Sequence, residues 1–316
     1  MKAALIENYG DIGQLIYTDA QTPAIAANQV LIKVHAAGVN PVDCYIRGGM
    51  FEDTGTHSLP LTLGWDTAGT VEQVGKAVTK HKVGDQVFAM APFDKNGSYA
   101  QYLAIEANIV VSKPKNLSFA QSAAVPLAAL TAWQGLFTEG KLQAGQRVLI
   151  HNTSGGVGSF AVQLAKAAGA HVIGTASAKN REFVEGLGVD QFIDYQDSKF
   201  EDLVAPVDLV FAGAVGGVGG DDVVARSLQV IKRGGHLISL FDEIDYALAL
   251  ERGITYHKLM VQPNAADLTQ IRDLLEQDKV QVHLDSVFDL KDAQLAHQRS
   301  ESKRTVGKIV LQVVAD

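Results

Sequence analysis

A glycine-rich turn between an apolar run and a helix limits the folds open to this chain more than any other segment does. Residues 147–150 form the apolar run, and residues 159–168 continue as an amphipathic helix. The turn between them contains Ser154, Gly155, Gly156, Val157 and Gly158. A helix N-terminus offers free N–H groups and the positive end of the helix dipole, and glycines let a phosphate approach the backbone. This order of elements predicts that the five turn residues bind the pyrophosphate of a dinucleotide.

The turn departs from the usual dinucleotide fingerprint at its first glycine position, where the chain has Asn152. After glycine, asparagine is the residue that best tolerates a positive φ. We therefore expect the turn to keep its shape. The alternative interpretation is a glycine turn that only connects a strand to a helix and binds no ligand.

Composition and charge are typical of a globular protein and exclude some partners. Hydrophobic residues make up 47% of the chain and charged residues 20%. The 27 Lys and Arg against 35 Asp and Glu give a formal net charge of −8, which argues against nucleic acid or an anionic membrane as a main partner. No run of about 18 apolar residues is present, and the first residues do not resemble a signal peptide. We therefore expect a cytoplasmic location and a small-molecule substrate.

Cysteine and histidine usage argues against disulfides and metals. Cys44 is the only cysteine, which excludes an intramolecular disulfide and a site with several thiolate ligands. The nine histidines are scattered without the spacing of a metal-binding motif. We predict no metal site.

The hydrophobic pattern changes near residue 120 and indicates two domains. Residues 30–35, 69–74 and 86–90 are short apolar runs separated by turn residues, a pattern typical of a small barrel or sandwich. Further along, we expect strands at 147–152, 171–176, 191–195, 207–213, 236–241 and 254–261, and helices at 156–168, 180–187, 221–232 and 265–278. This alternation indicates an α/β domain with a parallel, doubly wound sheet. A last strand at 307–313 can return to the first domain.

The end of the second strand of the α/β sheet indicates which cofactor binds. An NAD site places Asp or Glu there, about 20 residues after the glycine turn, to bind the ribose hydroxyls. Residues 174–181 contain no acid and offer instead the hydroxyl of Ser177, the amide of Asn180 and the cations Lys179 and Arg181. These groups suit a 2′-phosphate, so we expect NADPH rather than NADH. The alternative for either cation is a solvated charge at a helix start.

Several segments together resemble one protein family nearly from end to end. They are residues 37–47 (AGVNPVDCYIR), 63–69 (LGWDTAG), 83–87 (VGDQV), the glycine turn and residues 307–310 (GKIV). With them the chain is similar to medium-chain dehydrogenases/reductases of the zinc-independent quinone oxidoreductase branch. The resemblance implies a GroES-like β-barrel catalytic domain at residues 1–122, completed by about 280–316. It also implies a Rossmann dinucleotide-binding domain at residues 123–279.

The resemblance also implies the type of chemistry. Zinc-dependent relatives carry a Cys ligand at the position of Asn40 and a His ligand at that of Trp65, and neither residue here is such a ligand. The implied reaction is hydride transfer to a quinone or to the C=C bond of an α,β-unsaturated ketone or aldehyde, acceptors that are already electrophilic. Trp65 and Asp66 are either the apolar wall and polar anchor of the pocket or purely structural.

Three further assignments concern residues in the segment 37–47. Asn40 and Tyr45 are expected to line the acceptor pocket, where the Asn40 amide donates to the carbonyl oxygen. Tyr45 donates a hydrogen bond or a proton. Asp43 is either a further member of the catalytic group or forms, with Arg47, a pair that fixes the conformation of the same turn.

For the cofactor, the resemblance implies contacts beyond the glycine turn. Thr131 is expected near the nicotinamide, and Tyr195 near the adenine or the 2′-phosphate. Ser177 is expected to contact that phosphate, with Lys179 and Arg181 as alternatives for its cation. Leu240 and Lys308 are also expected at the cofactor.

Two hypotheses for the function follow. The first is an NADPH-dependent quinone or enone reductase. The alternative is an NADPH-binding protein with little or no turnover, in a sensor or structural role. In either case the resemblance implies a homodimer, in which the strand at 254–261 provides an exposed sheet edge.

Overall fold

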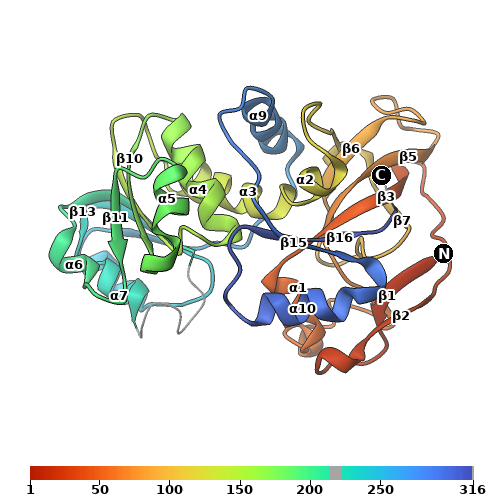
Figure 1. Cartoon of the computed structure of the whole chain (residues 1–316), viewed down its shortest axis with the longest axis horizontal. Coiled ribbons are helices and arrows are strands. Elements are labelled where there is room, and N and C mark those ends of the chain that lie inside the picture. Colours follow the sequence, from red (N-terminus) through yellow and green to blue (C-terminus); the bar gives the residue numbers. More distant parts are fainter. Residues whose placement is uncertain (214–221, 315–316) are drawn as a thin grey trace. The chain divides into compact units, whose positions relative to one another are not determined.

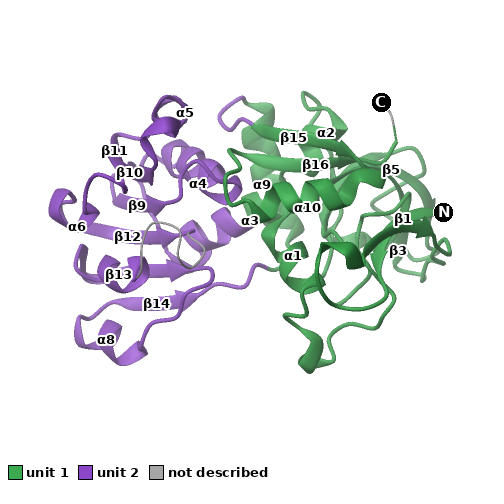
Figure 2. Cartoon of the chain, turned by 60° about the horizontal axis from the view of Figure 1, so that its bottom comes forward, with its two compact units in different colours: residues 1–130, 262–277, 282–316 green, residues 131–261, 278–281 purple. Residues whose placement is uncertain are grey.

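The structure is a computed structural model that describes residues 1–213 and 222–314. The chain divides into two compact units (Figure 2). Unit 1 contains residues 1–130, 262–277 and 282–316, and unit 2 contains residues 131–261 and 278–281. Residues 123–130 and 262–277, which the sequence analysis assigned to the dinucleotide-binding domain, belong to unit 1.

Unit 2 is built on a six-stranded sheet in which every neighbouring pair of strands is parallel. The strands are β9 (Arg147–His151), β10 (His171–Ala176), β11 (Gln191–Asp194), β12 (Val207–Ala212), β13 (Ile231–Ser239) and β14 (Thr255–Lys258). Their order is β11-β10-β9-β12-β13-β14, the doubly wound order of a Rossmann sheet. Apolar residues of the central strands, such as Leu149, Val210 and Leu237, are completely buried. The predicted parallel α/β sheet is therefore confirmed.

Short helices connect the strands of unit 2 (Figure 1). They are α4 (Gly156–Ala167), α5 (Arg181–Gly186), α6 (Phe200–Leu203), α7 (Val223–Ser227) and α8 (Tyr246–Glu251). Helices α4 and α5 pack against β10, and α8 packs against β14. Helix α3 (Pro126–Trp133), which continues as a π-helical segment (Gln134–Glu139), precedes β9.

The helix predicted at 221–232 is wrong in its extent. Helix α7 ends at Ser227, and β13 already begins at Ile231. Ile231 pairs with Val207 of β12, before a shift in register. Pairing with a neighbouring strand thus overrides the local helical pattern. Residue 221, the predicted start of the helix, lies outside the described residues.

Unit 1 is rich in β-strands, as the sequence predicts. One sheet has the order β15-β16-β3-β5-β6-β8, with β7 also paired to β3, and a second has the order β2-β1-β4. The strands are β1 (Lys2–Ile6), β2 (Leu15–Asp19), β3 (Gln29–Val39), β4 (Leu61–Thr62), β5 (Asp66–Val74), β6 (Gln86–Met90), β7 (Tyr102–Glu106), β8 (Val111–Ser112), β15 (Leu284–Asp289) and β16 (Lys308–Gln312). The helices are α1 (Pro41–Arg47), α2 (Phe119–Ala123), α9 (Ala265–Glu276) and α10 (Ala293–Glu301).

The C-terminal strand β16 joins the sheet of unit 1, which confirms that the end of the chain returns to the first domain. In the antiparallel pair of β16 and β3, Ile309 lies opposite Val39. In the antiparallel pair of β3 and β5, Gly38 lies opposite Asp66. These two registers bring the ends of β3, β5 and β16 together.

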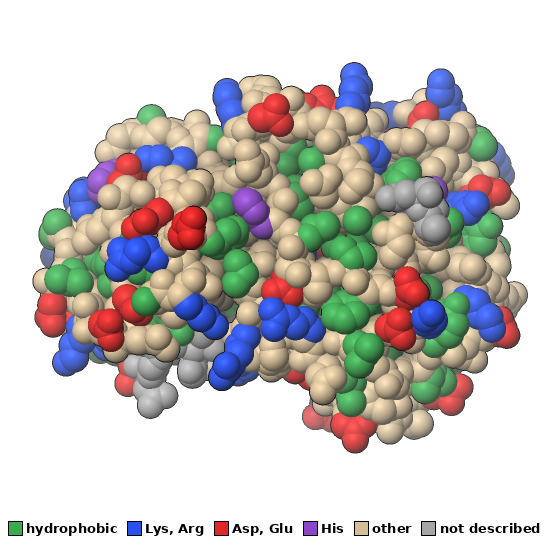
Figure 3. Space-filling model, viewed as in Figure 1, with side chains coloured by type: hydrophobic (Ala, Val, Ile, Leu, Met, Phe, Trp, Pro, Cys, Tyr) green, Lys and Arg blue, Asp and Glu red, His purple; other side chains and the backbone are tan. Residues whose placement is uncertain are grey.

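The surface of the chain carries charges of both signs. On the face drawn in Figure 3, acidic and basic side chains are intermixed. Among the described residues, no helix has the length and apolar character needed to cross a membrane.

Candidate cofactor and active sites

The glycine turn of unit 2 has the shape of a phosphate-binding turn. Asn152 has a φ of 57°, which confirms that this residue takes the left-handed conformation expected of the missing glycine. Gly155 is the N-cap residue of α4, and no side chain caps this helix end within the described part of the chain. A Cβ atom on Gly158 would lie 2.1 Å from the carbonyl oxygen of Asn152, so only glycine allows the turn to fold back on the helix. The first N–H groups of α4 are therefore available to a ligand.

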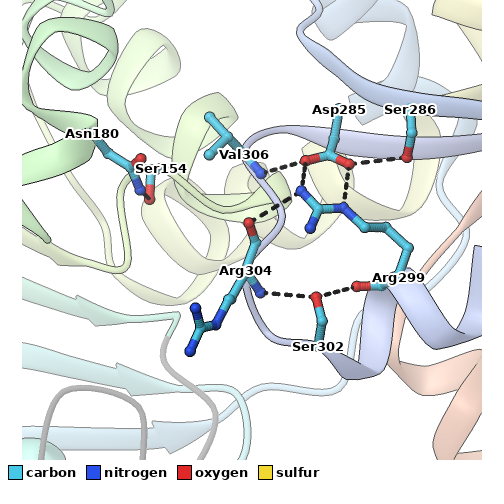
Figure 4. A network of polar contacts seen from close by, with 8 residues as sticks. All are labelled: Ser154, Asn180, Asp285, Ser286, Arg299, Ser302, Arg304 and Val306. Carbon is cyan, nitrogen blue, oxygen red and sulfur yellow. Dashed lines mark hydrogen bonds and ion pairs between the residues drawn. The ribbon is translucent and has the colours of Figure 1, made fainter.

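The segment after β10 is tied to this turn. Figure 4 shows the Asn180 amide, which donates a hydrogen bond of 2.9 Å to the hydroxyl oxygen of Ser154. Asp194, the last residue of β11, accepts a hydrogen bond of 3.1 Å from the N–H of Ala178. Its carboxylate thus helps to hold the backbone of this segment. The segment itself has no acidic side chain between Ala176 and Arg181.

The two cations of this segment differ in their contacts. The Arg181 guanidinium lies 3.2 Å from a carboxylate oxygen of Glu185 and 4.2 Å from the centre of the Phe192 ring. Lys179 is exposed and makes no hydrogen bond or ion pair with the residues that the structure describes. Lys179 can therefore bind an anion without breaking an existing contact, whereas Arg181 would have to leave Glu185.

Other cofactor candidates lie at the same edge of the sheet. Tyr195 follows the end of β11 and Leu240 follows the end of β13, and both are half-buried. Because the strands are parallel, these ends meet the glycine turn and Ser177 at the carboxyl edge, where Rossmann sheets bind their ligands. Thr131 is buried in α3. Contacts of these residues with a cofactor stay predictions.

In unit 1, Asn40 and Asp43 form the start of α1. The Oδ2 atom of Asp43 accepts hydrogen bonds from the N–H of Asn40 at 2.8 Å and from the hydroxyl of Tyr99 at 2.7 Å. Burial raises the pKa of Asp43 to about 7, although both hydrogen bonds oppose the rise. Its Oδ1 atom is buried without a hydrogen-bond partner among the described residues. Asp43 therefore fixes the start of the helix, and its catalytic role stays a prediction.

The suggested pair of Asp43 and Arg47 is not formed. The Arg47 guanidinium contacts Nδ1 of His297 at 2.9 Å and forms an ion pair with Glu301, and both partners are on α10. Burial, together with the charge of Arg47, lowers the pKa of His297 to about 3. The ring is thus neutral near pH 7, with Nδ1 as the acceptor. Arg47 joins α1 to α10 instead of bracing its own turn.

The side chain of Asn40 is held between Lys308 and Asp66, and all three side chains are buried. The Nδ2 atom of Asn40 donates to Oδ2 of Asp66 at 2.9 Å. The Nζ atom of Lys308 donates to Oδ1 of Asn40 and lies 3.5 Å from Oδ2 of Asp66. Burial raises the pKa of Asp66 and lowers that of Lys308, and the attraction between the two groups opposes both shifts. The structure therefore places Lys308 with the catalytic candidates of unit 1, and its contact with the cofactor stays a prediction.

The loop that leads to Lys308 is anchored on β15. Asp285 accepts hydrogen bonds from the Arg299 guanidinium at 2.8 and 2.6 Å and from the N–H of Val306 at 3.0 Å (Figure 4). The N–H of Lys308 donates to the carbonyl oxygen of His283 at 2.9 Å. These bonds fix the start of β16 and with it the root of the Lys308 side chain.

Tyr45 and Trp65 differ in exposure. Tyr45 is half-buried on α1, so it is the most accessible of the four catalytic candidates. Trp65 is completely buried, with its ring centre 5.6 Å from that of Phe93 and 6.2 Å from that of His57. In this structure Trp65 is part of the core of unit 1, and a contact with substrate stays a prediction.

The sequence analysis missed two residues of this network, Tyr99 and His297. Both are far from α1 in the sequence, and a single buried Tyr or His has no local pattern that marks its partner. The sequence does contain one signal of this close packing, which is Gly38. A Cβ atom there would lie 2.5 Å from the carbonyl oxygen of Ala123 and 2.7 Å from Oδ2 of Asp66. The glycine in the segment 37–47 thus marks a close approach of α2 and β5 to β3.

Acidic, histidine and cysteine side chains do not form a metal-binding cluster in the described residues, since no group of three or more of them could hold a metal ion. The expectation of zinc-independent chemistry still depends on the residue types at positions 40 and 65.

Comparisons with known proteins identify the family. The family described as alcohol dehydrogenase GroES-like domain matches residues 26–115, and the family described as zinc-binding dehydrogenase matches residues 187–311. The chloroplastic NADPH-dependent alkenal/one oxidoreductase of Arabidopsis thaliana is 36% identical over 98% of this chain and 79% of its own length. The quinone oxidoreductase from Coxiella burnetii matches with a TM-score of 0.90 and 35% identity over 99% of both chains. The Escherichia coli quinone oxidoreductase, solved in complex with NADPH, matches with a TM-score of 0.87 and 27% identity over 99% of this chain and 100% of its own.

A parallel Rossmann sheet with a glycine turn, joined in one chain to a GroES-like β-domain, defines a two-domain, dinucleotide-dependent dehydrogenase or reductase. Identity over nearly the whole length narrows this class further. The chain belongs to the medium-chain dehydrogenase/reductase family, in its quinone oxidoreductase branch. The predicted fold class and family are both confirmed.

Proposed function

We propose that this chain is an NADPH-dependent oxidoreductase that reduces quinones or the C=C bond of α,β-unsaturated ketones and aldehydes. The observation that carries the proposal is the segment after β10, which offers cations and no acid and is tied by Asn180 to the uncapped start of α4. The names of the Arabidopsis and Escherichia coli relatives support the same cofactor and acceptor classes.

The residues of unit 2 fit this cofactor. The free N–H groups at the start of α4 bind the pyrophosphate, and the Ser177 hydroxyl with the Lys179 ammonium binds the 2′-phosphate by charge-assisted hydrogen bonds. Thr131, Tyr195 and Leu240 complete the cofactor contacts, as the sequence predicts. When bound, NADPH supplies a hydride.

The residues of unit 1 act on the acceptor. Reduction at the β-carbon of an enone leaves negative charge on the carbonyl oxygen, which donors in the site stabilise. Tyr45 and Asn40 provide an O–H and an N–H for this oxygen. Tyr45 is the proton source of the two, because a phenol ionises far more readily than an amide. Asp43 fixes the start of the helix that carries both groups.

A panel of acceptors tests this function. Loss of NADPH absorbance is followed with a quinone, an alkenal and an enone, and each reaction is repeated with NADH. We expect turnover with at least one class and a kcat/KM with NADPH at least about 10-fold above that with NADH, because NADH lacks the phosphate. A preference for NADH contradicts the cofactor assignment. Tight binding of NADPH without turnover favours the non-enzymatic alternative.

Lys179→Ala is expected to raise the Kd for NADPH by about 10-fold and to leave the Kd for NADH unchanged. A hydrogen bond to a charged group contributes about 1.5–3 kcal/mol, and the exposure of Lys179 places it at the lower end. Arg181→Ala is the matched control, and its Kd for NADPH stays within about twofold because Arg181 is bound to Glu185. Isothermal titration of both variants with both nucleotides measures these values. An equal loss of NADH affinity in Lys179→Ala, or a larger effect of Arg181→Ala, shows that the assignment is wrong.

We also propose a homodimer that forms through β14. This strand is at one end of the sheet order, and the helix that packs on it, α8, carries the exposed apolar side chains of Tyr246, Leu248 and Leu250. Met260, just after β14, is exposed as well. An open strand edge beside an apolar surface fits pairing with a second copy across a two-fold axis. A cytoplasmic location is proposed from the sequence alone.

A further inference from the structure

A buried lysine in unit 1 has an unusual set of partners. The Lys308 ammonium donates to Oδ1 of Asn40 and to the carbonyl oxygen of Val39 at 3.2 Å. It lies 3.5 Å from Oδ2 of Asp66. Burying a cation is costly unless it is paired and hydrogen-bonded. Lys308 meets this condition, and one of its partners is the neutral side-chain amide of Asn40, a catalytic candidate.

Lys308 and Asp66 together define which way the Asn40 amide points. An ammonium only donates and a carboxylate only accepts, so Oδ1 of Asn40 must face Lys308 and Nδ2 must face Asp66. Asp66 is itself held by the N–H of Leu127, which donates to its Oδ1 at 2.6 Å. One Nδ2 hydrogen is thus used by Asp66, and the second has no partner among the described residues.

The contact with Lys308 makes the Asn40 amide a stronger donor, whereas the role of Asp66 is to fix its orientation. A charge-assisted bond to Oδ1 draws electron density away from the amide nitrogen, and in a buried network such polarisation passes from one hydrogen bond to the next. The second Nδ2 hydrogen of Asn40 therefore carries more positive charge than it would without Lys308.

We propose that Lys308 is a positioning residue that fixes and polarises the Asn40 amide, so that Asn40 donates to the acceptor oxygen as it becomes negative. This inference rests on the proposed function for the identity of the acceptor. A donor aimed at a developing oxyanion contributes up to about 10²–10³ in kcat. Lys308 contributes part of that effect without touching the substrate.

Lys113 provides a matched control, because it is a second buried lysine of unit 1. Its ammonium donates to the carbonyl oxygens of Pro114 and Leu117. Lys113→Met therefore has the cost of replacing a buried ammonium, but it leaves Asn40 alone. We expect its kcat to stay within about twofold of that of the unaltered chain.

A kinetic double-mutant cycle with Asn40→Ala and Lys308→Met tests the proposal. Each single variant is expected to lower kcat by about 10- to 100-fold, with little change in the KM for NADPH. If Lys308 acts through Asn40, the double variant is no slower than the slower single variant. Effects that multiply, or an equal loss of kcat in Lys113→Met, overturn the proposal. Lys308→Gln, which keeps a neutral donor, replaces Lys308→Met in the cycle if the methionine variant does not fold.

A second readout needs no activity. In protein labelled with ¹⁵N-asparagine, Asn40→Ala identifies the side-chain NH₂ signals of Asn40. Lys308→Met is expected to shift these signals, and Lys113→Met is expected to leave them unmoved. Unmoved Asn40 signals in Lys308→Met overturn the positioning role. By contrast, the proposed function is refuted if the unaltered chain consumes no NADPH with any acceptor. The comparison of the Asn40 signals in the two lysine variants then still decides the role of Lys308.

Discussion

His151, the last residue of β9, gives unit 2 a pH-dependent stability whose size follows from its contacts. Its Nδ1 atom lies 3.1 Å from the hydroxyl oxygen of Thr175, and its Nε2 atom lies 3.1 Å from that of Ser227. The Ser227 hydroxyl donates to the carbonyl oxygen of Val223 at 2.7 Å, so it accepts from Nε2–H. Nδ1 is then the acceptor for Thr175, and the neutral ring satisfies both partners.

The magnitude follows from the pKa. Burial, with a smaller contribution from the charge of Arg226, lowers the pKa of His151 from 6.5 to about 3. As the pH falls below 6.5, the unfolded chain takes up a proton that the folded chain refuses, so His151 destabilises the fold progressively until pH 3. At pH 5 this linkage removes about 2 kcal/mol of the free energy of unfolding, relative to pH 8.

His151→Asn isolates this effect, because it keeps an acceptor for Thr175 and cannot titrate. At pH 8 we expect the variant to be less stable by about 1–3 kcal/mol, since it loses packing and the bond to Ser227. At pH 5 this deficit is expected to shrink by about 2 kcal/mol. Urea unfolding followed by far-UV circular dichroism at both pH values measures it. Other titrating groups, such as Asp43, are present in both proteins and cancel. A deficit of the same size at both pH values would refute the reasoning.

Two further predictions concern packing and assembly. Gly38→Ala is expected to lower the free energy of unfolding by about 1–3 kcal/mol, because its Cβ would press on Asp66 and a backbone carbonyl. The control is Gly48→Ala, whose Cβ meets only ordinary contacts. Equal free energies of unfolding for the two variants in a urea titration would contradict the packing argument. Leu250→Asp, at a side chain that is 78% exposed, is expected to convert the proposed dimer to a monomer in size-exclusion chromatography with light scattering. Leu203→Asp, at another exposed leucine of unit 2, keeps the dimer. If the unaltered chain is itself a monomer, the proposed dimer is refuted.

The shape of the glycine turn and its place in the sheet could be predicted because the signals for them are local. The glycine turn and the segment at 174–181 are each continuous in sequence, and a strand–turn–helix unit fixes their geometry with few long-range contacts. The left-handed Asn152 follows from its side chain and its position in the turn. What the sequence left open was the choice between Lys179 and Arg181. That choice depends on Glu185 and Phe192, whose contacts with Arg181 appear only in the folded chain.

The acceptor side could be predicted only in part because its geometry is set by strand register. Asn40 and Tyr45 stand out in a recognisable segment, but Lys308 lies 268 residues from Asn40 along the chain. It becomes a neighbour of Asn40 only because β16 pairs with β3 at Ile309 and Val39. A shift of that register by one residue would turn the Lys308 side chain to the other face of the sheet. No local pattern encodes such a pairing.

The proposed cofactor site and the proposed acceptor site both place hydrogen-bond donors where negative charge is expected, although the chain as a whole is acidic. The formal net charge is −8, and on the face drawn in Figure 3 acidic and basic side chains are intermixed. Ionic screening limits the range over which exposed charges interact to about 8–10 Å at physiological salt. Lys179 and the first N–H groups of α4 lie at the carboxyl edge of the sheet in unit 2, where we propose that the cofactor binds, and Lys308 contacts Asn40 in unit 1. A buried cation is screened much less than an exposed one. Added salt should therefore weaken the binding of NADPH through Lys179, while the effect of Lys308 on kcat stays nearly constant.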